Sequence, residues 1–139
     1  MAARATIDLE AGPVRLLVCA MLIVVAVIHL LPLSGVLGGK RLASLYGLPM
    51  DEPNLALLMR HRAVLFGLLG VFFLVAAFTA PLQASAFIAG FVSVGSFLWL
   101  ARSVGGYNAQ VARVVMADVV ALACLVVGAA ARLYLRIQG

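Results

Sequence analysis

The stretch "AVLFGLLGVFFLVAAFTAPL", residues 63–82, contains no charged side chain. As an α-helix it is about 30 Å long, at 1.5 Å per residue, which matches the hydrocarbon thickness of a bilayer. Three further apolar runs lie at residues 16–33, 84–101 and 114–131. The only polar side chains of note in them are His29 in the first run and Asp118 in the last. The sequence therefore predicts four membrane-spanning helices.

The composition supports this prediction. Of the 139 residues, 65% are hydrophobic and 11% are charged, against about 45–50% and 25% in soluble domains. A soluble fold of this size cannot bury so much apolar surface. Helices satisfy their own backbone hydrogen bonds in lipid, and no run alternates apolar and polar residues as a half-buried strand would. We predict an all-α fold, with residues 1–139 forming a single four-helix transmembrane domain.

The first connection between spans is expected to be structured. In "GGKRLASLYGLP", residues 38–49, the apolar side chains share one helical face, as in a short helix lying in the membrane interface and ended by Gly47. Asp51 is then expected to cap the next helix, with Pro53 in its first turn. If this helix continues into the second span, residues 60–62 lie within a helix and not in a loop.

Short connections and small residues indicate how the spans pack. Pro81 breaks the chain within "TAPLQ", which predicts a tight antiparallel hairpin of the second and third spans. Small residues allow close contact between membrane helices. They form one stripe on the third span, Ala86, Gly90 and Ser93, and one on the fourth, Ala117, Ala121, Cys124 and Gly128. These stripes favour an intramolecular bundle and leave contact between chains as the alternative.

Four spans place both termini on one side of the membrane and the two longer connections on the other. The side with the longer connections carries six Lys and Arg residues and the terminal side four. The positive-inside rule then places the long loops in the cytoplasm and the termini outside. We expect the first span to be retained, because no small-residue cleavage site follows it.

Polar residues gather at the loop side of the predicted bundle. A carboxylate inside a membrane helix costs at least about 2.5 kcal/mol on insertion scales, so Asp118 should face a partner or a wet cavity. We predict a one-sided polar pocket, in which Arg60 or Arg62 pairs with Asp118 either as a structural clamp or in a ligand or proton site. Its members are His29, Arg60, His61, Arg62 and Asp118. Other residues are expected to anchor the helices at the headgroups: Lys40, Arg41, Tyr46, Trp99, Arg102, Tyr107 and Arg113.

No catalytic motif is recognisable, and the balance of evidence favours a protein that is not an enzyme. We expect no metal and no nucleic-acid partner, because ligand clusters and basic blocks are missing. Two histidines at one side leave haem ligation as a minor alternative. The main interpretation is a membrane module that binds a lipid-like ligand or a partner subunit. The alternatives are a quinone-linked oxidoreductase component and an oligomeric transporter or channel.

Three segments resemble a group of small four-helix bacterial membrane proteins: "VIHLLPLSGVLG", "RLASLYGLPMDEPNLALLMRHRAVLFGLLG" and "GFVSVGSFLWLARSVGGYN". More distantly, they are similar to DoxX-like proteins, which implies a bacterial inner membrane and a link to quinone chemistry. Proteins of this pattern have sometimes carried the label phosphopantetheine adenylyltransferase. That enzyme is a soluble α/β protein with an H-x-G-H motif, and this chain has only His29 and His61, so its sequence does not support adenylyltransferase activity.

Overall fold

Four long helices run the length of the protein. The computed structural model describes the backbone of residues 2–138 and the side chains of residues 12–138. The helices are α1 (Ala2–Leu30), α3 (Pro53–Phe78), α4 (Gln83–Val104) and α5 (Ala109–Gln138). Each belongs to a segment long and apolar enough to cross a membrane, which confirms the predicted all-α bundle of an integral membrane protein.

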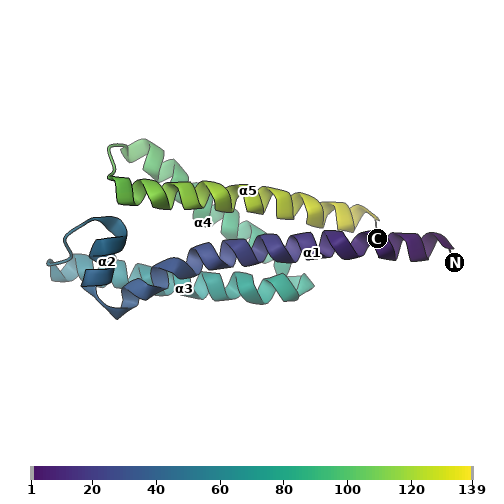
Figure 1. The fold of residues 1–139 in the computed structure, drawn as a ribbon, viewed down its shortest axis with the longest axis horizontal. Coiled ribbons are helices and arrows are strands. Elements are labelled where there is room, and N and C mark those ends of the chain that lie inside the picture. The colour runs from purple at the N-terminus through teal and green to yellow at the C-terminus, as the bar shows by residue number, and fades with distance from the viewer. Residues whose placement is uncertain (1, 139) are drawn as a thin grey trace.

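The two ends of the bundle differ in what they carry (Figure 1). Both chain termini lie at one end, here called the terminal end. The opposite end, here called the loop end, holds the 3₁₀ helix η1 (Leu31–Leu37) and the short helix α2 (Gly39–Tyr46). The predicted interfacial helix is therefore confirmed. It ends at Gly47, whose positive φ of 64° favours glycine, as expected.

The first turn of α3 differs from the prediction in one residue. Glu52, and not Asp51, is the N-cap: its carboxylate accepts hydrogen bonds from the backbone N–H groups of Asn54 at 2.9 Å and Leu55 at 2.6 Å. The reason is that Pro53 occupies the first helical position, so the capping position falls on the residue just before it. From Pro53 the helix continues into the second span without a break, as predicted.

The connection between α3 and α4 is as short as predicted, but the two helices do not form a tight hairpin. Only Thr79 and the 3₁₀ turn η2 (Ala80–Leu82) separate them, yet α3 and α4 contact each other sparsely. The most extensive contacts are those of α1 with α5 and α3, and α4 packs chiefly on α5. The prediction of a tight hairpin was wrong because helices that are neighbours in sequence need not pack together. Here the small residues on α4 and α5 favour contact between those two helices instead.

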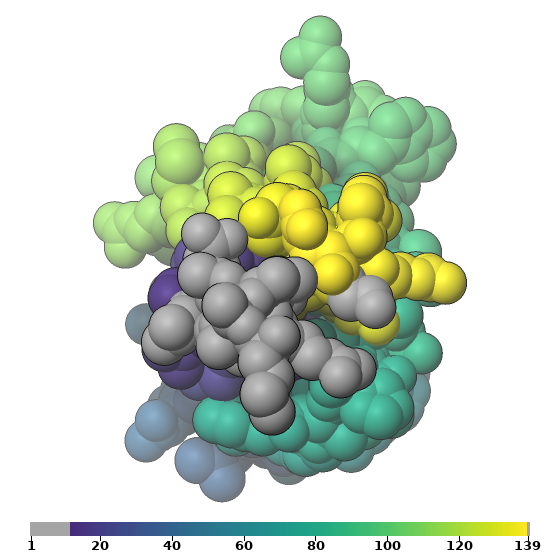
Figure 2. Space-filling model, turned by 90° about the vertical axis from the view of Figure 1, so that its right-hand side faces the viewer, coloured from purple at the N-terminus to yellow at the C-terminus, as the bar shows by residue number. Residues whose placement is uncertain are grey.

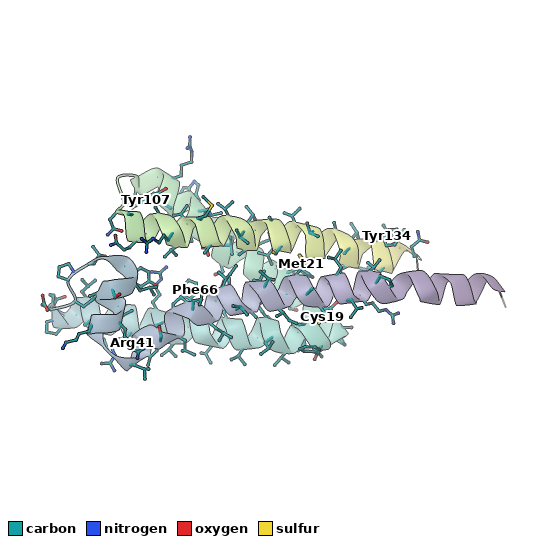
Figure 3. All side chains as sticks on the ribbon, viewed as in Figure 1. Cys19, Met21, Arg41, Phe66, Tyr107 and Tyr134 are labelled. Atoms are coloured by element: carbon teal, nitrogen blue, oxygen red, sulfur yellow. The ribbon has the colours of Figure 1, made fainter. Side chains whose placement is uncertain are left out.

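The predicted small-residue stripes meet within the chain. A Cβ at Gly90 of α4 would lie 2.6 Å from a methyl carbon of Leu125 in α5. A Cβ at Gly128 would lie 2.9 Å from the ring of Phe87 and 3.0 Å from the Cβ of Met21, which is labelled on α1 in Figure 3. These glycines let α1, α4 and α5 approach closely. At the terminal end, the end of α5 lies beside the turn from α3 to α4 (Figure 2).

Candidate binding site at the loop end

Two polar side chains are buried within the described bundle. His29 of α1 is 1% exposed and Asp118 of α5 is 5% exposed. Both lie in the half of the bundle nearer the loop end, with Asp118 nine residues beyond the start of α5, or roughly 14 Å by helical rise. The inference that the two side chains face the protein interior is therefore confirmed.

His29 is held by hydrogen bonds on both ring nitrogens. Nδ1 lies 2.9 Å from the carbonyl oxygen of Val25, and Nε2 lies 3.3 Å from the hydroxyl of Ser93. Since a carbonyl can only accept, Nδ1 donates, and in the neutral ring Nε2 accepts from Ser93. The ring also packs edge-on against Phe73, at 4.9 Å between centroids. His29 is thus a fixed part of the wall, joining α1 to α4.

Arg62 occupies the centre of the loop end. Its guanidinium carbon lies 5.5 Å from the ring centroid of Tyr46, 5.0 Å from that of Phe66 and 5.6 Å from that of Phe97. All three distances fall within the range of cation–π attraction. Because the rings come from α2, α3 and α4, one cation connects three elements whose sequence positions are far apart.

The structure brings together three of the five predicted pocket residues. His29, Arg62 and Asp118 line one cavity, whereas Arg60 points away and donates from Nε to the carbonyl of Val36 at 3.2 Å. His61 is exposed on another face of α3. Of the two arginines predicted to pair with Asp118, Arg62 is therefore the one that shares its cavity.

The cavity has a volume of about 440 Å³ and lies among α1, η1, α2, α3 and α5. Figure 3 labels two of its lining residues, Arg41 and Phe66, at the loop end. The lining divides into a polar and an apolar group. The polar group comprises His29, Ser34, Arg41, Ser44, Tyr46, Arg62, Gln110, Arg113 and Asp118, and the apolar group comprises Ile28, Leu31, Pro32, Leu45, Phe66, Val114 and Ala117.

The charge of this cavity is positive. Three arginines, Arg41, Arg62 and Arg113, line it with a single acidic residue, Asp118. Among the side chains of residues 12–138, none forms a hydrogen bond with Asp118, so its oxygens keep their acceptor capacity for a molecule in the cavity. The site can therefore accept an anion beside the arginines and a hydrogen-bond donor beside Asp118.

Three of the residues predicted to be headgroup anchors also line the cavity. Tyr46 is 5% exposed and lines the cavity with Arg41 and Arg113. Burial raises the pKa of the Tyr46 hydroxyl, while Arg62 lowers it and Asp118 raises it further. The hydroxyl is thus neutral at physiological pH and can donate. The other predicted anchors lie in exposed positions, which suits contact with headgroups: Lys40, Trp99, Arg102 and Tyr107.

Asn108 is a residue that sequence reasoning missed. Its side-chain oxygen accepts from the N–H of Val111 at 2.8 Å and caps α5, while its amide donates to the carbonyl of Tyr46 at 2.9 Å. Asn108 thereby fixes the end of α2, and with it the Tyr46 wall, to the start of α5. Asn108 lies six residues before the predicted span at 114–131, and asparagine is a preferred N-cap residue, so this signal could have been found.

Across the described part of the chain, no group of three His, Cys, Asp or Glu residues could hold a metal ion. His29 and His61 do not share the cavity. The chain matches no protein family, and neither a curated protein nor a solved structure shows a match.

Proposed function

We propose that this integral membrane protein is a non-enzymatic module that binds an anionic, lipid-like amphiphile in the loop-end cavity. The observation that carries the proposal is that three arginines line one cavity together with seven apolar residues. A soluble anion would not need the apolar wall, and a neutral lipid would not need the arginines. An amphiphile requires both.

Five of the polar residues that line the cavity have a role in this proposal. The guanidinium groups of Arg62 and Arg113 bind the oxygens of a phosphate or carboxylate, for which their planar geometry is suited. The neutral hydroxyl of Tyr46 adds one donor. Asp118 accepts from a hydroxyl or amine elsewhere on the head of the ligand. His29 orients the wall and does not form a hydrogen bond with the ligand, because both of its nitrogens are engaged.

The test uses the full chain in phosphatidylcholine nanodiscs, with binding followed by native mass spectrometry. The probe is 1-oleoyl lysophosphatidic acid, and 1-oleoyl lysophosphatidylcholine is the zwitterionic comparison. Loss of a charge-assisted hydrogen bond costs about 1.5–3 kcal/mol, so Arg62→Gln and Arg113→Gln should each weaken binding roughly ten- to hundred-fold. Arg102→Gln is the matched control, since Arg102 is exposed at the same end but does not line the cavity.

Equal binding of the anionic and zwitterionic probes, or equal binding by all three variants, would contradict the proposal. A quinone is the second candidate ligand, supported by the Tyr46 and Phe66 rings beside donor groups and by the DoxX-like resemblance. A quinone-mass adduct that survives purification, and that lysophosphatidic acid displaces, would favour this alternative. A partner subunit or a second copy of the chain would be seen in the same spectra as a defined complex.

We further propose that the protein lies in a bacterial inner membrane with its loop end in the cytoplasm, following the excess of Lys and Arg there. Ser44 is exposed at that end, so a Ser44→Cys variant should resist a membrane-impermeant thiol reagent in intact cells and react in inverted vesicles. Labelling in intact cells would reverse the orientation.

A further inference from the structure

A second hollow lies on the other side of Arg62 from the cavity. This hollow, here called the groove, has a volume of about 470 Å³ and is bounded by α3, α4 and α5. Arg62 and Phe66 line both the cavity and the groove, so the two spaces share a wall made of two side chains. A group bound at Arg62 therefore lies next to both the cavity and the groove.

The groove is apolar in effect, although two serines line it. The hydroxyl of Ser96 donates to the carbonyl of Ser93 at 3.0 Å, and the hydroxyl of Ser93 is engaged with His29. The rest of the surface comes mainly from Phe97, Leu100, Ala101 and Val104. A polar ligand would find few partners here, whereas a hydrocarbon chain would need none.

The shape of the groove also suits a chain. From Ser93 to Val104 it follows α4 for twelve residues, or roughly 16 Å by helical rise. The sparse contact between α3 and α4 leaves the groove open towards lipid, where Val104 is 80% exposed.

We infer that the groove between α3 and α4 holds the hydrocarbon chain of a single-chain amphiphile whose anionic group is bound at Arg62 in the cavity. This inference rests on the proposed function and specifies its ligand. Arg62, held by aromatic rings on both sides of the shared wall, marks the boundary between head and chain.

The experiment maps the chain directly. The probe is a lysophosphatidic acid with a diazirine near the end of its acyl chain, irradiated with the full protein in phosphatidylcholine nanodiscs. Crosslinked peptides are then identified by mass spectrometry. We expect crosslinks on α4 at Phe97, Leu100 or Ala101, and we expect excess unlabelled lysophosphatidic acid to abolish them. Bulk lipid contacts would persist under this competition.

Two variants sharpen the result. Ala101→Trp fills the groove and should reduce groove crosslinks at least ten-fold, while binding of octyl phosphate, whose chain is short, changes less than two-fold. Val92→Trp is the matched control, because Val92 lies on α4, is 66% exposed and does not line the groove. If Ala101→Trp does not fold, the wild-type crosslinking map still decides the question.

The outcomes separate the two proposals. Competable crosslinks that fall outside the groove would overturn this inference and leave the proposed function standing. Groove crosslinks that excess competitor does not reduce would report bulk lipid or a partner helix and also overturn it. If octyl phosphate and lysophosphatidic acid both fail to bind, the proposed function itself fails.

Discussion

The two halves of this bundle are built from the same four helices but pack differently. Towards the terminal end the core is closed by fully buried apolar side chains, with Val18, Leu22, Phe73, Ala86 and Leu125 at 0–1% exposure. Towards the loop end two hollows lie on either side of Arg62, whereas the hollow of about 520 Å³ at the terminal end lies beside this packed core, at the turn from α3 to α4. One chain thus combines a dense half with an open half.

In the terminal half, the close packing of α4 and α5 depends on small residues. Gly90 and Gly128 lie in the terminal half of α4 and α5, where they let Leu125 and Phe87 fit against the facing backbone. Lipid provides no hydrophobic drive for helices to associate, so contact depends on such close fits. Between α3 and α4, the large side chains of Arg62 and Phe97 line the groove instead.

The largest expected effect comes from breaking the dense half. Gly128→Leu would force a side chain into the ring of Phe87 and the Cβ of Met21. Overpacking of this kind typically costs 1–3 kcal/mol, and we expect a loss of about 3 kcal/mol in the free energy of unfolding, measured in mixed micelles. Gly95→Leu is the control, because a Cβ at Gly95 meets nothing within 4 Å. Equal losses in the two variants would refute the division into halves.

The second effect concerns the charges of the open half. Arg62 and Asp118 line the same cavity, whereas Arg60 is bound to Val36 outside it. In double-mutant cycles, Arg62→Gln combined with Asp118→Asn should deviate from additivity by roughly 1–2 kcal/mol. Arg60→Gln with Asp118→Asn should be additive within about 0.5 kcal/mol. The reverse pattern would identify Arg60 as the partner of Asp118.

The sequence predicted the dense half better than the open half. Apolar runs and small-residue stripes have a fixed helical period, so the four spans, α2 and the contact at Gly90 and Gly128 follow from spacing. The presence of His29 and Asp118 in one polar region also follows, because a buried polar group in a span needs a partner.

The membership of the cavity could not be predicted in the same way. Adjacent residues on a helix point in directions about 100° apart, so Arg60, His61 and Arg62 could not all face one site, and the rotation of α3 depends on its packing. Tyr46 and Arg41 enter the cavity because α2 folds back over it, which is a long-range contact that no local pattern reports. The splaying of α3 from α4 is likewise a property of the whole bundle.

A smaller effect is expected at the joint between α2 and α5. Asn108→Ala removes both the cap of α5 and the bond to the Tyr46 carbonyl, and we expect it to cost about 1 kcal/mol. Hydrogen exchange should accelerate in α2 and in the first turn of α5. Ser103→Ala, which removes only a local bond to the Leu100 carbonyl, serves as the control. Unchanged exchange in α2 would show that Asn108 does not fix the cavity wall.

The smallest expected effect lies outside the membrane, at the cap of α3, and it depends on pH. The backbone N–H groups of Asn54 and Leu55 lower the pKa of Glu52 below its ordinary value of 4.5. A carboxylate with a lowered native pKa stabilises the fold above pH 4.5 and loses that contribution as the pH falls through the native value. The stability difference between the native chain and Glu52→Gln should therefore be greatest near neutral pH and shrink below pH 4.5. Asp51→Asn controls for the loss of one negative charge, and a difference that grows on acidification would contradict the assignment of Glu52 as the cap.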